Sequence, residues 1–178
     1  ISNNMIKINL ENIYEPISIS EDFIEIIFHS EIENDEVIPL YIRFSSINDI
    51  HLPNVYNLGF GPIDKDGNID DLIRLRHKNL NKLFSTLVFF AISFLENNKG
   101  SIVGIDGSDE SRAYLYHRIF KSNKEELSEI LVTIGIDWYV KLLRNGDVER
   151  DDDGMPYFKP LLEPFNYLRK NSDLYRYY

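Results

Sequence analysis

The charged side chains of this sequence form three short groups whose spacing could support the binding of a ligand or a partner. The first group, Asp64–Asp71, places carboxylate or amide oxygens at alternate positions, as calcium-binding loops do. Such loops need a glycine at position six, where Ile69 stands, and a glutamate at position twelve, where Leu75 stands. We therefore expect a solvated hairpin loop with a tight turn at Asp66-Gly67, and no metal site.

The second group consists of three consecutive aspartates, Asp151, Asp152 and Asp153, followed by Gly154. Adjacent side chains of like charge cannot all converge on one ion, and they usually face solvent. The same charges would suit a basic surface on another protein. We take these three aspartates as the candidate partner-binding residues.

The third group is basic and precedes a predicted helix. Arg74, Arg76, His77 and Lys78 form a local cluster of cationic or ionisable side chains in an acidic chain. A basic cluster of this kind keeps open the binding of an anionic ligand.

Other catalytic and metal-binding motifs are missing from the sequence. The absence of cysteine excludes disulfides, thiol nucleophiles and Cys-ligated zinc. The four histidines do not form the spaced pairs that bind zinc on a helix, and no nucleophile elbow surrounds a serine. Gly59-Phe60-Gly61 lacks the third glycine of a dinucleotide-binding loop.

The composition bounds the class of protein. The chain has 178 residues, 43% of them hydrophobic, which is enough to bury a core. Its 19 Lys and Arg against 29 Asp and Glu give a net charge of −10, which argues against nucleic-acid binding and suits a basic protein partner. The longest apolar stretch, Leu83–Leu95, is too short to span a bilayer, and no signal peptide is visible. We expect a cytoplasmic protein in which residues 1–4 are an expression remnant and 5–178 form a single domain.

Hydrophobic periodicity predicts the elements of the first half. Strands are expected at 23–29, 40–44 and 55–61, the second with one face toward solvent. The glycines of the third strand indicate a bulge or the close approach of another backbone. Asn79 or Asn81 should cap a long, central helix that ends near Asn97.

The second half continues with shorter elements. A strand at 101–105 should run parallel to the strand before the long helix, and Ser108 or Asp109 should cap a helix through Phe120. A further short helix or turn at 124–129 and a strand at 130–136 follow. An Asn145-Gly146 turn predicts a hairpin between 139–143 and the residues from Val148 onward, and 151–178 is expected to be irregular and rich in Pro and Tyr. The resulting fold class is α+β, with a single mixed sheet, a long central helix and a second helix packed on the sheet.

The helix at Ser111–Phe120 resembles the last helix of the GNAT acyltransferases, in which a small residue, Arg, a Leu-Tyr pair and a closing Phe recur. The order strand, helix, strand, helix, strand from Val55 to Ile136 is also similar to the cofactor-binding half of that fold. The resemblance implies that Tyr116 is the general acid that protonates the departing thiolate of coenzyme A. It also implies that Arg76, Asn79 and Asn81 stand where the pyrophosphate-binding loop lies, with asparagine in place of both small residues.

The chain as a whole resembles an uncharacterised family of small Bacteroidota proteins. The shared features are Tyr56–Gly61, an Asp-rich loop, Ser108–Tyr116 and a closing segment like Phe165–Lys170. This resemblance implies a bacterial origin but no activity.

Two functions therefore remain open. The first is an acidic binding protein without an evident catalytic set, such as an antitoxin, immunity or defence-module component that recognises a basic protein through Asp151–Asp153 and needs no cofactor. The second is an acyl-CoA-dependent N-acyltransferase that uses acetyl-CoA or another acyl-CoA, held by Arg76, Asn79 and Asn81, with Tyr116 as the acid.

Overall fold

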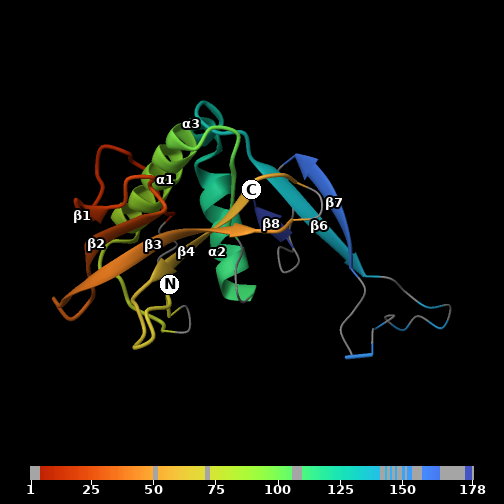
Figure 1. Ribbon diagram of the computed structural model, residues 1–178, viewed down its shortest axis with the longest axis horizontal. Coiled ribbons are helices and arrows are strands. Elements are labelled where there is room, and N and C mark those ends of the chain that lie inside the picture. The colour runs from red at the N-terminus through yellow and green to blue at the C-terminus, as the bar shows by residue number, and fades with distance from the viewer. Residues whose placement is uncertain are drawn as a thin grey trace. The chain divides into compact units, whose positions relative to one another are not determined.

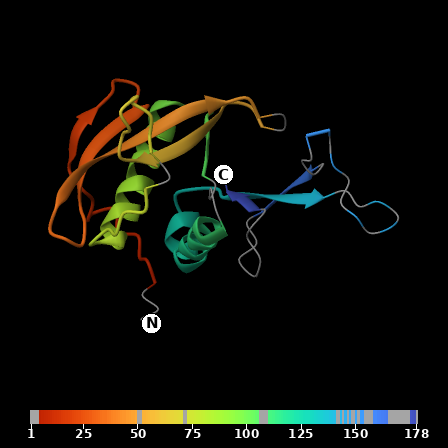
Figure 2. The same cartoon turned by 90° about the horizontal axis from the view of Figure 1, so that it is seen from below.

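The computed structural model describes two compact units, Ile1–Ile105 and Asp106–Tyr178, which are taken in turn (Figures 1 and 2). The described residues are 5–49, 52–70, 73–105, 110–140, 143, 145, 147, 150, 152–153, 158–164 and 175–177.

Within the described part of the first unit, five strands form one open sheet. They lie side by side in the order β1 (Pro16–Ile19), β2 (Glu25–Glu31), β3 (Val37–Ile47), β4 (Val55–Gly61) and β5 (Ile102–Gly104). Neighbouring strands are antiparallel from β1 to β4, whereas β4 and β5 are parallel. The predicted strands and the predicted parallel pair are confirmed, with shifts of a few residues at their ends. β1 was not predicted, because four residues that begin with proline give too short a pattern.

The alternation along β3 divides the sheet into two faces. Leu40, Ile42 and Phe44 are buried, while Tyr41 and Arg43 between them remain partly exposed. The antiparallel register places Ile26 and Phe28 of β2 and Leu58 of β4 on the same face as Leu40, Ile42 and Phe44. The expected strand with one face toward solvent is therefore confirmed.

Helix α1 (Leu80–Asn97) covers the buried face of this sheet, as Figure 2 shows. The ring of Phe94 stacks on that of Phe44 with 4.3 Å between centroids, and Phe84 contacts Phe60 edge-on at 6.2 Å. Asn79 caps the helix, and its side chain accepts a hydrogen bond from the backbone N–H of Lys82 (2.9 Å). The predicted helix, its cap and its central position are confirmed. In the described part of the chain, no helix is long and apolar enough to cross a membrane.

Polar residues inside α1 hold the N-terminal arm, residues 5–15. Ser85 and Thr86 are almost fully buried between apolar residues of α1. The backbone N–H of Asn9 donates to Ser85 Oγ (2.8 Å), and that of Tyr14 donates to Thr86 Oγ1 (2.9 Å). The two hydroxyls thus satisfy backbone donors of a segment that lies outside the described helices and strands.

The glycines of β4 admit the segment that follows the strand. A Cβ at Gly61 would lie 3.1 Å from the carbonyl oxygen of Asp70 and 3.1 Å from Ile69 Cγ2. At Gly59 the nearest atom, Ile69 Cδ1, would be at an ordinary 3.6 Å. The predicted close approach of another backbone is therefore confirmed at Gly61.

The described part of the second unit contains two helices and a second sheet. Its elements are α2 (Glu110–Ser122), α3 (Lys124–Ser128), β6 (Ile134–Val140), β7 (Phe158–Pro164) and β8 (Tyr175–Tyr177). The three strands pair antiparallel in the order β7-β6-β8. The prediction of a single sheet is therefore wrong. The proposed caps Ser108 and Asp109 lie outside the described residues, as does Asp151.

Three further predictions for the second unit need correction. The strand expected at 130–136 begins at Ile134, because Ile130 and Leu131 both donate to the carbonyl of Leu127 and extend the turn after α3. Among the described residues, the strand partner of β6 on this side is β7, which begins at Phe158 and not at Val148. The segment 151–178 is not irregular throughout, because it contains β7 and β8. Pro160 and Pro164 are tolerated in β7 because it lies at the edge of its sheet, where one side of the backbone needs no N–H donor.

Candidate functional site

The segment that was expected to bind pyrophosphate pairs with the end of β2. Lys78 N–H donates to the carbonyl of Glu31, and Glu33 N–H donates to the carbonyl of Arg76, both at 2.9 Å. His77 lies opposite Ile32 in an isolated antiparallel bridge. Residues 76–78 are thus held in extended pairing against the β2–β3 hairpin before α1 begins.

The cations of this segment form ion pairs with acids of the same hairpin. Lys78 Nζ lies 2.6 Å from Asp35 Oδ1, and Arg76 Nη1 lies 3.7 Å from Glu33 Oε2. The hydrogen bond from Lys78 lowers the pKa of the Asp35 carboxyl, and the same contact raises the pKa of the Lys78 ammonium. Both pairs are exposed and therefore contribute little to stability. They do, however, lower the positive charge available to an anion at this point.

His77 occupies a half-buried position beside the end of β2. Its Nδ1 lies 3.2 Å from the hydroxyl of Ser30, a fully buried residue of β2. Burial lowers the pKa of His77 below its ordinary value, so the neutral imidazole is favoured. His77 is thus oriented by a structural contact to the sheet.

The two asparagines at the start of α1 are engaged by the protein itself. The Asn79 side chain caps the helix, and Asn81 Oδ1 accepts a hydrogen bond from the backbone N–H of Lys7 at 3.2 Å. The structure therefore brings Arg76, Asn79 and Asn81 onto one stretch, as expected. Each of the three contacts a group of the same chain.

The remaining predicted site residues lie in the second unit. Tyr116 is on α2 and is 6% exposed. Asp152 and Asp153 are exposed residues of a turn, in agreement with their expected contact with solvent.

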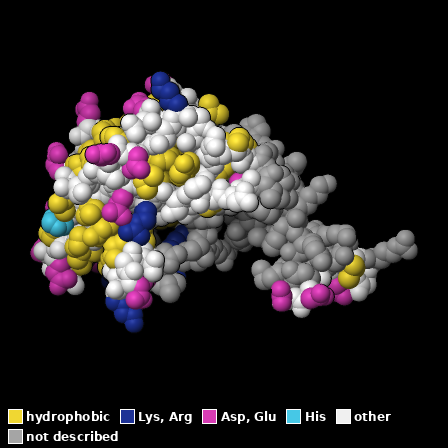
Figure 3. Space-filling view, in the orientation of Figure 1, with side chains coloured by type: hydrophobic (Ala, Val, Ile, Leu, Met, Phe, Trp, Pro, Cys, Tyr) yellow, Lys and Arg dark blue, Asp and Glu magenta, His cyan; other side chains and the backbone are white. Residues whose placement is uncertain are grey.

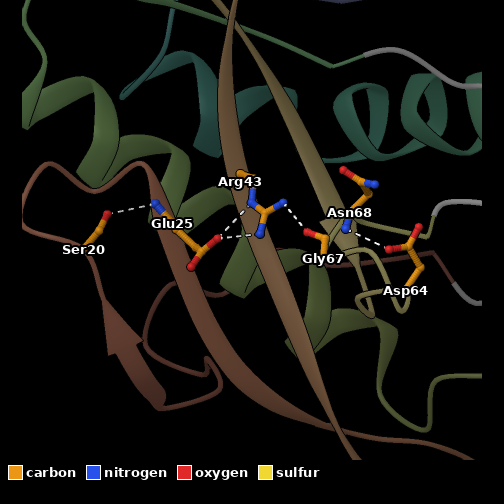
Figure 4. Close-up of polar contacts among 6 residues, drawn as sticks. All are labelled: Ser20, Glu25, Arg43, Asp64, Gly67 and Asn68. Atoms are coloured by element: carbon orange, nitrogen blue, oxygen red, sulfur yellow. Dashed lines mark hydrogen bonds and ion pairs between the residues drawn. The ribbon is translucent and has the colours of Figure 1, made fainter.

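The Asp64 loop uses its own carboxylate as a structural acceptor, as Figure 4 shows. Asp64 Oδ1 accepts hydrogen bonds from the backbone N–H groups of Asp66 (2.8 Å) and Asn68 (2.9 Å). The carbonyl of Gly67 accepts from Arg43 Nη1 (2.9 Å), and Arg43 also contacts Glu25 Oε2 at 2.7 Å. Across the residues with described positions, no group of three or more His, Asp or Glu is arranged to hold a metal ion.

Sequence reasoning missed a stretch of uniform charge, residues 8–42, which we call the acidic segment. Nine Asp or Glu and not one Lys or Arg lie between Lys7 and Arg43. The segment includes β1, β2 and the start of β3, which lie next to one another at one edge of the sheet. Within residues 1–105 as a whole, eight Lys or Arg against 15 Asp or Glu give a net charge of −7. Counting charges along windows of the sequence would have found this segment.

The face of β2 and β3 turned away from α1 carries apolar side chains within this acidic segment. Ile27 and Tyr41 lie opposite one another and are partly exposed, and Val37 on the same face is 57% exposed. Figure 3 shows hydrophobic side chains over this part of the sheet, with acidic side chains close to them. We call this surface of β2 and β3 the helix-free face.

An open five-stranded sheet with one helix on it, followed by a second α+β unit, defines a protein of mixed α+β class. A family of unknown function, DUF6934, matches residues 10–150, and the chain belongs to that family. The matched region includes most of the acidic segment and excludes Asp151–Asp153. No curated protein and no solved structure matches the chain.

Proposed function

We propose that this protein is a non-catalytic binding protein that recognises a basic protein partner. The acidic segment carries this proposal, because it presents exposed carboxylates such as Glu15, Glu31 and Glu36 and contains no Lys or Arg of its own. Arg43, Arg76 and Lys78 approach it from other segments, but its nine carboxylates outnumber these three cations. Negative potential over such a surface accelerates encounter with a positively charged protein and disfavours anionic partners.

The use of the expected cofactor loop by the chain itself also supports a binding role. Arg76 and Lys78 are paired with Glu33 and Asp35, and the side chains of Asn79 and Asn81 accept hydrogen bonds from backbone N–H groups. An acyl-CoA pyrophosphate would have to compete with these contacts. Within the class of binding proteins we favour an antitoxin, immunity or defence-module component of Bacteroidota, on the basis of size, charge and the lineage expected from the sequence.

Association with a cationic probe tests this proposal. The probe is a 20-residue poly-L-lysine, and the readout is its association rate at 20 and 300 mM NaCl. The triple variant E15Q/E31Q/E36Q should slow association severalfold at 20 mM NaCl, because it removes negative charge that attracts the probe. At 300 mM NaCl the difference from the unmodified chain should disappear, because salt screens the attraction. The matched control E96Q/E125Q/E126Q changes the net charge equally at exposed positions outside the segment and should have less effect.

Two results would remove the acidic segment as the recognition surface. Equal effects of the two triple variants would show that net charge alone attracts the probe. A larger effect of D151N/D152N/D153N would move the recognition surface to the C-terminal aspartates and leave a basic partner as the proposed ligand.

A second candidate function is an acyl-CoA-dependent N-acyltransferase with a GNAT-like fold. Two observations favour it. β4 and β5, which precede and follow α1 in the chain, pair in parallel, and the side chain of Arg76, shortly before that helix, is 85% exposed. Calorimetric titration with coenzyme A and acetyl-CoA tests it. Saturable micromolar binding that is lost in Arg76→Ala, with turnover lowered in Tyr116→Phe, would replace the binding proposal. Absence of binding at millimolar ligand would retire the enzyme.

A further inference from the structure

The helix-free face combines apolar side chains with a border of negative charge. Along β3, Val37, Pro39 and Tyr41 occupy alternate positions on this face, and Ile27 of β2 lies directly opposite Tyr41. Glu31 lies opposite Val37, and the exposed Glu36 precedes it in the chain. Beside Tyr41 the segment Ile69-Asp70 packs on this face against Gly61, and the exposed His29 lies opposite Pro39. The solvent-facing side of an antiparallel sheet is normally polar, so the four apolar residues that this segment leaves partly exposed indicate a contact surface.

Both β2 and β3 are paired along both of their edges, with β1 and β3 flanking β2, and β2 and β4 flanking β3. A partner therefore cannot add a strand to either of them and must pack on the face. The strip from Val37 to Tyr41 is about 13 Å long at roughly 3.3 Å per residue. This length corresponds to between two and three turns of an α-helix at about 5.4 Å per turn.

The charges around the strip select the partner. No Lys or Arg occurs between Lys7 and Arg43, and Arg43 itself is held by Glu25 and by the carbonyl of Gly67. At the other end of the strip, Arg76 and Lys78 pair with Glu33 and Asp35, and Lys78 also acts electrostatically on Glu31. The four carboxylates there, Glu31, Glu33, Asp35 and Glu36, still outnumber these two cations. A second copy of the chain would bring Glu31 and Glu36 against like charges. A helix with Lys or Arg beside its apolar stripe would place cations next to these carboxylates.

We propose that the helix-free face docks a cationic amphipathic helix of the partner, with the helix's apolar stripe on Ile27, Val37, Pro39 and Tyr41 and its cations beside Glu31 and Glu36. This inference rests on the proposed function and adds the surface and the form of the partner. The hydrophobic contact provides affinity, and the carboxylates fix the orientation.

The test uses the full chain and two synthetic peptides of identical Leu and Lys content, one with an amphipathic helical pattern and one scrambled. Fluorescence anisotropy at 150 mM NaCl should show tighter binding of the patterned peptide. The double variant V37T/Y41T should weaken that binding at least tenfold and leave the scrambled peptide unaffected. The matched control I73T/V132T removes exposed apolar side chains elsewhere and should change the affinity less than twofold.

Amide chemical-shift mapping on the unmodified chain gives a second readout that does not depend on the variants. The patterned peptide should shift amides of β2 and β3, and shifts confined to other segments would overturn the proposal. Loss of binding in E15Q/E31Q/E36Q but not in V37T/Y41T would refute this face and preserve acidic recognition. A dimer that V37T/Y41T dissociates in sedimentation would assign the face to a second copy. Equal binding of both peptides, or of neither, would also contradict the proposed docking.

Discussion

At the scale of single residues, side chains that seemed suited to chemistry serve the fold. Asn79 caps α1, Asp64 closes its loop, and Arg43 joins β2 to that loop. Their hydrogen-bond partners are backbone groups or side chains of the same unit. Such contacts account for these polar residues without a ligand, and they define positions at which substitution should affect stability before binding.

Gly61 is the residue at which a single added methyl group should be most costly. Gly61→Ala would place Cβ 3.1 Å from the carbonyl oxygen of Asp70, and should lower the free energy of unfolding by about 1–3 kcal/mol. Gly59→Ala is the matched control, because its nearest neighbour would be at 3.6 Å. Urea denaturation measures both. Equal effects of the two variants would contradict the close contact at Gly61.

His77 should make stability depend on pH. Burial lowers its pKa below 6.5, so the unfolded chain binds the proton more tightly than the folded chain. The free energy of unfolding should therefore fall as the pH drops through 6.5, and this contribution should vanish at higher pH. Urea denaturation at pH 7.5 and 5.5 should show a smaller difference in His77→Gln than in the unmodified chain. An undiminished difference would assign the effect to another group.

At the scale of elements, α1 organises the first unit from two sides. Its apolar residues pack on the sheet, and its hydroxyl groups fix the N-terminal arm. A helix that is apolar almost all round is explained by this double role, because the arm covers part of the surface that the sheet leaves open.

Thr86→Val should loosen the N-terminal arm while it preserves the shape of the side chain. The change leaves the buried N–H of Tyr14 without its acceptor, which should cost about 1–3 kcal/mol. Hydrogen exchange at the Tyr14 amide should accelerate, and urea denaturation should show the loss. Ser93→Ala is the control, because Ser93 Oγ donates to the carbonyl of Phe89 within the helix. A protected Tyr14 amide in the variant would show that this bond does not hold the arm.

At the scale of the whole molecule, the chain is divided into two compact units, and the first is the more acidic of the two. Residues 1–105 carry a net charge of −7 out of −10. The same unit contains the helix-free face and the acidic segment. The proposed recognition of a basic partner therefore draws on the composition of this unit.

The first unit should fold without the second. Its core includes Ile26, Phe28, Leu40, Ile42 and Val55, all with 0% exposure, and a unit of this size can bury enough apolar surface to be stable. A fragment of residues 1–105 should show dispersed amide resonances and a single cooperative thermal transition. A fragment without cooperative unfolding would show that residues 106–178 are required for its stability.

The amino-acid sequence by itself determined the local elements of the first unit and its α+β class. Alternation along Leu40–Phe44, the helical period with Asn79 as cap, and the glycines of β4 are local patterns with direct structural causes. The second unit was less accessible, because β6 pairs with a strand that begins only at Phe158. A pairing between distant residues leaves no periodic signal in either segment.

Only the tertiary structure decided how the candidate site residues are used. The resemblance to the acyltransferases grouped Arg76, Asn79 and Asn81, but it could not show that Glu33 contacts Arg76 and that Lys7 contacts Asn81 from distant positions in the chain. Likewise, the acidic segment was present in the sequence as a run of charge, and the fold alone placed Ile27 opposite Tyr41 within it. Ion pairs and exposed faces depend on which segments the sheet brings together, and that information is absent from any single window of residues.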